Sequence, residues 1–301
     1  LKEVANLPFP FLTQLLGHAF DKPGKRVRPA ITLLSANFHP HDRETTETMA
    51  AAVELLHMAT LIHDDTVDNS SIRRGRSTLS SLWGGNVAVL AGDYVFAASA
   101  TFVCEPGNIR VIRRFSETIM ELSTGELDEI AEAYKINQTM EQYLRRIYNK
   151  TASLFATAGE AGAVLSDAPE ETVRSLKDYS RNLGMAFQIV DDILDFEGTQ
   201  EELGKPVGND LSRGILTLPS ILALERYPDS SPIVELFQNP NDENYRKRAV
   251  EMIQNSSIID DSYDRANQYC RKALDSLTDL APNPSRDSLE ELVGFVAVRR
   301  N

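Results

Sequence analysis

The sequence predicts an all-α protein. Nearly every segment repeats its apolar residues with the period of a helix, and no run alternates convincingly as a half-buried strand does. Short breaks rich in Pro, Gly, Asn and Asp separate these segments. The chain has 301 residues, of which 42% are hydrophobic and 25% charged, so a sizeable core is possible. We therefore expect residues 1–301 to form a single domain.

The elements follow from the apolar period and from the residues that start and stop helices. In chain order, helices are expected over residues 4–20, from a start near Pro29, and over 43–68, 86–103, 108–134, 139–165 and 170–196, with three to five more behind them. Asp42 is a candidate N-cap, and Thr139 with Gln142 resembles a capping box. The longest loop, 198–214, is polar and Gly-rich, which favours a catalytic lid.

The charge of the chain excludes one class of function. Its net charge is −13 and its pI about 4.9, so a bulk nucleic-acid binder is not expected. Positive charge is confined to two loops, one holding Lys22, Lys25, Arg26 and Arg28 and the other Arg73, Arg74 and Arg76. Small basic clusters of this kind indicate a bound polyanion.

The cysteines and the hydropathy suit a reduced, cytoplasmic protein. Cys104 and Cys270 form no CxxC pair and are expected to be ordinary residues. No signal peptide opens the sequence. Asp93 interrupts the most apolar stretch, 87–104, so no transmembrane segment is expected.

Two aspartate clusters of the form DDxxD dominate the sequence. Asp64, Asp65 and Asp68 form the first, and Asp191, Asp192 and Asp195 form the second. In each helix, the first and last aspartates share a face. Three carboxylates so close repel one another, and they oppose the helix dipole at a C-terminus. One copy could be a solvated helix end, but two copies in apolar stretches indicate a functional reason.

That reason is expected to be Mg²⁺, which binds carboxylates together with substrate phosphates. If the two helices face each other, their carboxylates surround the mouth of an apolar cavity and the basic loops close its rim. Such a site could hold a diphosphate while an activated carbon–oxygen bond ionises, because metal and cations take up the growing negative charge. An apolar cavity would then protect the carbocation from water.

At this point the residues carry a family resemblance. From Gly24 to about Pro219, the chain contains GKRVRP, LLHMATLIHDDTVD, RRG, AGDY, KT, FQIVDDILDF and GKPVGNDL. In this combination and order, the chain resembles the trans-type polyprenyl diphosphate synthases of the isoprenoid synthase fold. The resemblance implies about a dozen helices around a central cavity, a homodimer and Mg²⁺. It implies head-to-tail joining of isopentenyl diphosphate to an allylic diphosphate by ionisation, attack of the alkene and proton loss. The released diphosphate would be the base.

The resemblance also assigns roles by position. The implied metal ligands are Asp64, Asp65, Asp68, Asp191, Asp192 and Asp195. Isopentenyl diphosphate would be held by Lys25, Arg28, His57 and Arg74. The allylic diphosphate or the cation would be contacted by Arg73, Lys150, Thr151, Gln188 and Lys205. The residues expected to matter most for catalysis are Asp64, Asp68, Asp191, Arg73, Lys150 and Lys205.

Each basic or polar residue in this set also has an ordinary structural explanation when it is taken alone. Lys25 and Arg28 could be solvated, Lys150 and Thr151 could be surface positions, and Gln188 could be a core amide. One departure is visible, because many relatives carry Lys where this chain has Ile215. Either Arg213 substitutes for that Lys, or one diphosphate contact is lost.

Two small residues bear on the length of the product. Thr60 and Ala59 lie four and five residues before the first motif, about one helical turn below Asp64. Short-chain relatives carry bulky aromatics there as a floor. A product longer than fifteen carbons is therefore expected, with Phe96 or Phe102 as a deeper barrier. The alternative is that Ala59 simply packs against another helix.

Three other functions were weighed. A class I terpene cyclase shares the fold and the first motif, but its second motif is usually of the Asn/Ser/Glu type. A di-iron bundle would use the ExxH run Glu54–His57, which needs a second copy that is not present. A non-catalytic subunit of a heteromeric synthase usually loses aspartates from one motif, whereas this chain keeps all six.

Overall fold

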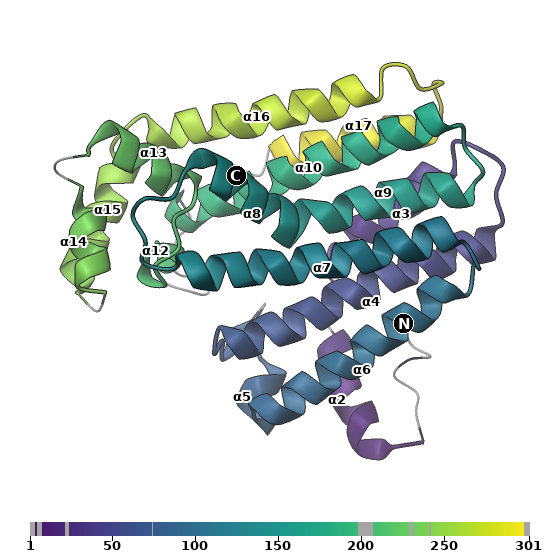
Figure 1. Cartoon of the computed structure of the whole chain (residues 1–301), viewed down its shortest axis with the longest axis horizontal. Coiled ribbons are helices and arrows are strands. Elements are labelled where there is room, and N and C mark those ends of the chain that lie inside the picture. Colours follow the sequence, from purple (N-terminus) through teal and green to yellow (C-terminus); the bar gives the residue numbers. More distant parts are fainter. Residues whose placement is uncertain are drawn as a thin grey trace. The chain divides into compact units, whose positions relative to one another are not determined.

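The computed structural model describes residues 4, 8–21, 24–73, 75–197, 207–228, 231–240 and 242–297. These residues are mostly helical, which confirms the all-α class (Figure 1). They group into two compact units, Leu1–Ser116 with Thr157–Arg174, and Glu117–Ala156 with Ser175–Asn301. The expectation of a single domain over 1–301 stays a prediction.

The first unit is organised on a pair of long helices. Its elements are α2 (Pro10–Phe20), α3 (Val27–Ala36), α4 (Arg43–Val67), β1 (Ile72–Arg73), β2 (Arg76–Ser77), α5 (Leu79–Trp83) and α6 (Gly85–Cys104), with parts of α7 (Ile109–Glu132), α9 (Ser153–Leu165) and α10 (Glu170–Glu197). Helices α4 and α6 lie side by side (Figure 1), and Leu55 of α4 and Val95 of α6 are fully buried in one apolar cluster. Burial of that seam holds α4, and with it the first motif, in a fixed place.

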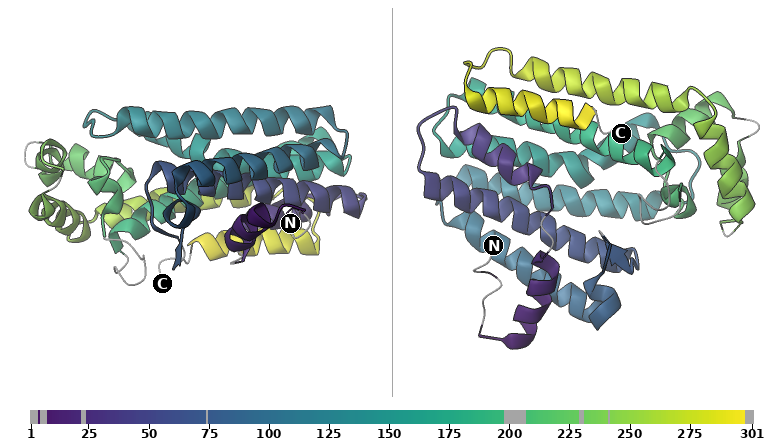
Figure 2. Two further views of the ribbon diagram at one scale, coloured as in Figure 1. Left: turned by 90° about the horizontal axis from the view of Figure 1, so that it is seen from below. Right: turned by 180° about the vertical axis from the view of Figure 1, so that it is seen from behind.

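The second unit takes the remaining parts of α7, α9 and α10. Its other elements are α8 (Met140–Ile147), η1 (Tyr148–Ala152), α12 (Asn209–Ser212), α13 (Leu218–Arg226), α14 (Pro232–Gln238), α15 (Glu243–Gln254), α16 (Ile258–Ser276) and α17 (Pro284–Ala297). Figure 2 shows α16 and α17 packed side by side. Tyr179 of α10 is fully buried, and its hydroxyl donates to the Leu289 carbonyl of α17 at 2.6 Å.

The predicted caps are confirmed. The Asp42 carboxylate accepts a hydrogen bond from the Thr45 amide at 2.8 Å and starts α4. Thr139 and Gln142 form the capping box that starts α8. In α9, a Cβ on Gly162 would lie 2.2 Å from the Thr32 carbonyl oxygen of α3, so this glycine permits close packing of the two helices.

Three local features differ from the expectations. Residues 139–165 form two α-helices separated by the π-helix η1, which helical period alone does not reveal. The loop at 70–76 contains a hairpin in which Ile72 pairs with Ser77 and Arg73 with Arg76, strands too short to alternate. Helix α5 was also missed. Of the predicted lid, residues 198–206 lie outside the described part.

Helix α6 bears on the expectation about membrane segments. In the part of the chain that the structure describes, it is the one helix long and apolar enough to cross a membrane, with 20 residues and a mean hydropathy of 1.7. Core helices of folded domains reach the same length and hydropathy, so the expectation of no transmembrane segment stays a prediction. A third of the most apolar stretch is buried within the structure, in its contact with α4 and its neighbours.

Candidate functional site

The first aspartate motif closes α4. Asp68 is the C-cap residue, and its amide donates to the Asp64 carbonyl at 2.8 Å, so the helical turn that places both carboxylates on one face is intact. Both side chains are half-buried. Asp65, between them, is buried. The motif therefore presents two accessible carboxylates and one that faces the protein.

Asp65 connects the motif to the hairpin that follows. The Arg73 Nε donates to the Asp65 carboxylate at 2.6 Å, and the Ser70 amide donates to the Asp65 carbonyl at 2.9 Å. Arg73 is only partly buried, so its guanidinium stays near the surface while it pairs with Asp65. The structure thus brings together two residues that the sequence assigned to neighbouring roles. Because Asp65 is buried and bonded to Arg73, it supports the motif from the protein side.

Helix α6 contacts the residue that precedes the first motif, His63. This contact was not predicted from the sequence. His63 Nε2 lies 3.1 Å from the Val89 carbonyl oxygen and 3.4 Å from the Asp93 carboxylate. A Cβ on Gly92 would lie 2.3 Å from the same nitrogen. The AGDY motif is explained by this contact, and the signal available was a glycine inside an otherwise apolar helix.

The other predicted residues of the first unit lie around α3 and α4. Lys25 is exposed and Arg28 is half-buried in the first turn of α3, behind Arg26 in a left-handed conformation with φ of 51°. His57 is half-buried, two turns before the motif. Arg74 lies outside the described residues. Their contacts with substrate stay predictions.

The second motif closes α10. Asp191 is half-buried, while Asp192 and Asp195 are buried. The Asp195 carboxylate accepts a hydrogen bond from the Asp210 amide at 3.1 Å, and its carbonyl accepts one from Gly208 at 2.8 Å. Asp195 therefore holds the start of α12, the end of the GKPVGNDL segment.

Asp192 is held on both oxygens. The Tyr143 hydroxyl donates to one at 2.7 Å, and the Gln188 amide nitrogen donates to the other at 2.8 Å. Burial raises the pKa of Asp192 to about 7, although both hydrogen bonds lower it. Burial also raises the pKa of Tyr143 well above its usual value. A metal at Asp192 would have to share oxygens that already accept these bonds.

Thr151 and Gln188, both assigned by the resemblance to the allylic diphosphate or the cation, lie next to each other in the structure. The Thr151 hydroxyl donates to the Gln188 side-chain oxygen at 2.6 Å. Thr151 lies in η1, which α10 approaches closely, because a Cβ on Gly184 would lie 2.8 Å from the Ala152 Cα. Gln188 is therefore bonded to side chains and is not the core amide bonded to backbone that was the alternative.

Lys150 is engaged by two carboxylates that sequence reasoning did not assign. Its ammonium lies 2.7 Å from Glu129 and 3.0 Å from Glu126, both on α7. A Cβ on Gly125 would lie 2.8 Å from the Lys150 amide nitrogen, so η1 and α7 are in direct backbone contact. Lys150 is thus a half-buried, positioned cation and not a solvated surface residue.

The remaining predicted residues leave one question open. Lys205 lies outside the described residues. Ile215 is buried, at 7% exposure, and Arg213 is the C-cap of α12. Whether Arg213 replaces the lysine of other relatives stays a prediction.

The described side chains form no closed metal site. In the described ranges, no group of three or more His, Cys, Asp or Glu side chains converges in a form that could hold a metal ion. Asp64 and Asp68 belong to the first unit and Asp191 to the second, so the meeting of the two motifs stays a prediction. Two accessible carboxylates without a closed cage suit Mg²⁺, which completes its shell with water and phosphate oxygens.

The predicted chain-length residues are placed as follows. Ala59 is fully buried in the apolar cluster that includes Leu55, Ala88 and Val95, with Phe96 and Phe102 at its edge. Thr60 is half-buried, and its hydroxyl donates to the His57 carbonyl at 2.8 Å. Ala59 does pack against another helix, so its role in product length stays a prediction.

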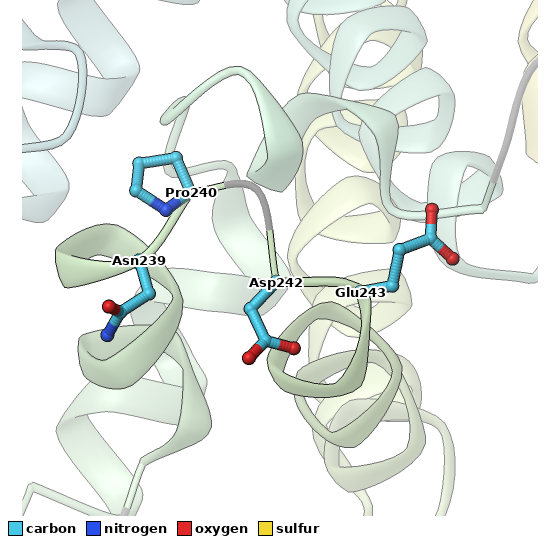
Figure 3. A pocket seen from close by; sticks show the side chains of 4 residues that line it. All are labelled: Asn239, Pro240, Asp242 and Glu243. Carbon is cyan, nitrogen blue, oxygen red and sulfur yellow. The ribbon is translucent and has the colours of Figure 1, made fainter.

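A surface depression lies away from these residues. Asn239, Pro240, Asp242 and Glu243 line it, where α14 meets α15 (Figure 3). Asp242 accepts a hydrogen bond from the Asn244 amide and Glu243 pairs with Arg246, so both acids serve α15 itself. We assign no chemistry to it.

Comparison with known proteins decides the family. The family model described as polyprenyl synthetase matches residues 9–253. This chain belongs to that family. It is a prenyltransferase, and its predicted isoprenoid synthase fold is confirmed.

Individual relatives agree with the family. The heptaprenyl diphosphate synthase component 2 of Geobacillus stearothermophilus is 40% identical over 94% of this chain and 88% of its own length. The crystal structure of a Staphylococcus aureus heptaprenyl diphosphate synthase matches with a TM-score of 0.95 and 36% identity, over 99% of this chain and 95% of the other. A Caulobacter crescentus polyprenyl synthase, complexed with calcium and isoprenyl diphosphate, matches with a TM-score of 0.93 and 34% identity, over 99% and 92%.

We predict that the two arginines of the hairpin differ in their effect on stability. Arg73→Ala leaves the buried Asp65 carboxylate without its guanidinium, at a cost of about 1–3 kcal/mol. Arg76→Ala breaks a pair with Asp21 in which both side chains are largely exposed, at a cost of about 0–1 kcal/mol. Thermal unfolding of the two variants should show a larger fall in Tm for Arg73→Ala. Equal falls would contradict the role given to Asp65.

Proposed function

We propose that this prenyltransferase condenses isopentenyl diphosphate with an allylic diphosphate, head to tail, to give a trans-polyprenyl diphosphate longer than fifteen carbons. The observation that carries the proposal is that both aspartate motifs are complete and each ends a helix, with Asp64 and Asp68 accessible in the first motif and Asp191 in the second. The relatives named as heptaprenyl diphosphate synthases support a long product.

The chain's own residues would divide the binding of two diphosphates. Asp64, Asp68 and Asp191 would hold Mg²⁺, which when bound neutralises charge on the leaving diphosphate. Arg73, directed by Asp65, would add a forked donor to the allylic diphosphate. Lys150 would add a point charge from η1. The resemblance assigns Lys205 to the same diphosphate.

The other diphosphate would be bound from the first unit. Lys25, Arg28, His57 and Arg74 would hold isopentenyl diphosphate. The side-chain oxygens of Thr151 and Gln188 are the polar atoms best suited to face a developing carbocation, because an oxygen lone pair stabilises positive charge that is kept from water. The proton would leave to the released diphosphate.

Location and assembly complete the proposal. Cys104 and Cys270 are free thiols in the structure, which supports the cytoplasm as the compartment. The homodimer implied by the resemblance is supported by α7. In the second unit, it exposes Met120, Leu127 and Ile130 at 60% or more, spaced by seven and three residues. We propose that a second copy covers this stripe, since such spacing suits pairing of helices.

One assay tests the reaction. The purified chain alone is incubated with isopentenyl diphosphate, allylic starters of increasing size and Mg²⁺, and the product lengths are measured. Products longer than fifteen carbons are expected, and chelation should abolish them until Mg²⁺ is restored. Activity only with a second, different subunit would favour a heteromeric synthase, as the name component 2 of the Geobacillus relative suggests. A cyclised product formed without isopentenyl diphosphate would indicate a cyclase.

The aspartates are tested by Asp64→Asn and Asp191→Asn. Each removes one charge at constant volume and should lower kcat about 10²- to 10³-fold, because the charge on the leaving group is no longer neutralised. Asp275→Asn, on the exposed face of α16, is the matched control and should turn over as the wild type does. Full turnover by both motif variants would overturn the proposed site.

Product length is tested by Ala59→Phe and Thr60→Phe. Each places an aromatic ring about one turn below Asp64 and should shift the products to shorter chains while turnover persists. Because Ala59 is packed, a fall in Tm is also expected. Ala88→Phe overfills the same cluster from α6 and is the control. If it shortens the products equally, repacking and not a floor at residue 59 explains the effect.

The dimer is tested by Leu127→Asp. Light scattering should show a dimer for the wild type and a monomer for the variant, since a buried charge opposes apolar pairing. Leu274→Asp, at an exposed apolar residue of α16, should stay dimeric. A wild-type monomer, or a dimeric Leu127→Asp protein, would place the interface elsewhere or remove it.

A further inference from the structure

A chain of three hydrogen bonds in the second unit has a fixed direction. Asp192, held by two donors, is an acceptor, so the Gln188 group that faces it at 2.8 Å is the amide nitrogen. The Gln188 oxygen must then face Thr151, and the Thr151 hydroxyl must donate to it at 2.6 Å. The orientation of one carboxylate therefore sets which atoms two further side chains present.

Tyr143 starts this chain. Its side chain is fully buried, and its hydroxyl donates to Asp192 at 2.7 Å. The guanidinium of buried Arg146 lies 5.8 Å from the centre of the Tyr143 ring and donates to Gln138 and to the Leu216 carbonyl. Arg146 thereby ties α8 to the chain ahead of α13 and fixes the ring between them.

We propose that Tyr143 is a positioning residue that, through Asp192, keeps the side-chain oxygen of Gln188 and the hydroxyl oxygen of Thr151 turned toward the reacting carbon. This deepens the proposed function and rests on it. Thr151 and Gln188 were assigned to the substrate from the sequence, whereas Tyr143 was not assigned a role.

Without the Tyr143 hydroxyl, the direction of the hydrogen bonds through Asp192, Gln188 and Thr151 would no longer be fixed. One buried oxygen of Asp192 would lose its donor, which is costly unless the carboxylate rotates toward another donor. A rotated carboxylate would no longer hold the Gln188 amide nitrogen in its present direction. The Gln188 amide would then be free to turn over and direct its N–H groups toward Thr151 and the site, where a hydrogen-bond donor repels positive charge on the substrate.

The test is Tyr143→Phe, with Tyr179→Phe as the matched control. Both remove one hydroxyl from a fully buried tyrosine, and the second breaks a bond of 2.6 Å to the Leu289 carbonyl, far along α10 from the motif. Tyr143→Phe should lower kcat about 10-fold or more, with KM for both diphosphates within about twofold of wild type. Tyr179→Phe should lower Tm to a similar extent and leave kcat within about twofold. Equal losses of kcat would overturn the proposal.

A double-mutant cycle tests whether the effect passes through Gln188. In a Gln188→Ala background, Tyr143→Phe should change kcat by less than about twofold, because the group it orients is gone. Independent, multiplicative losses would overturn the proposal.

A measurement without turnover separates this inference from the proposed function. In protein labelled with ¹⁵N-glutamine, the Gln188 side-chain signal is identified by its loss in Gln188→Ala. Tyr143→Phe and Asp192→Asn should both shift it, since asparagine presents its own N–H group and turns Gln188 over, and Tyr179→Phe should not. An unchanged Gln188 signal in Tyr143→Phe would overturn the positioning role of Tyr143, even if the condensation reaction is confirmed. If the Gln188 signal shifts as expected in the variants while the wild type forms no product, only the proposed function is overturned.

Discussion

The structure depends on keeping carboxylates at the C-terminal ends of two buried helices. Like charges and the helix dipole both oppose this arrangement, and burial adds a further cost. Each motif offsets this cost by bonding some aspartates to the protein while others stay accessible, Asp64 and Asp68 in the first motif and Asp191 in the second. Asp65 accepts from Arg73, Asp192 from Tyr143 and Gln188, and Asp195 from the start of α12. The DDxxD spacing therefore encodes two kinds of carboxylate.

The helices and the family could be predicted from the sequence, but the side chains that bond to the site residues could not. Asp42 and the Thr139–Gln142 box are local signals, read within one turn, and both were found. Ala59 shows the limit, because its small size left two interpretations open, room for the product or packing against another helix, and the structure shows it buried among Leu55 and its neighbours. Size alone does not say whether a methyl group faces a cavity or another helix.

Contacts between elements distant in sequence explain most of what was missed. The carboxylates that engage Lys150 lie more than twenty residues before it, and nothing in the KT pair indicates them. The same holds for Tyr143 and Asp192, which are 49 residues apart. Glycines were the one signal of these contacts in the sequence. Gly92, Gly125 and Gly184 each lie where another segment of the same chain approaches too closely to leave room for a side chain.

The π-helix η1 has a consequence for how this family can vary. A π-turn holds one residue more than an α-turn, so it is equivalent to a single insertion in a continuous helix. Deleting one residue from Tyr148–Ala152 would restore regular winding and rotate α8 by about 100° relative to α9. Tyr143 and Thr151 would then no longer address the same face of α10. Changes in length are therefore expected to be excluded from this stretch, even where changes of residue type are accepted.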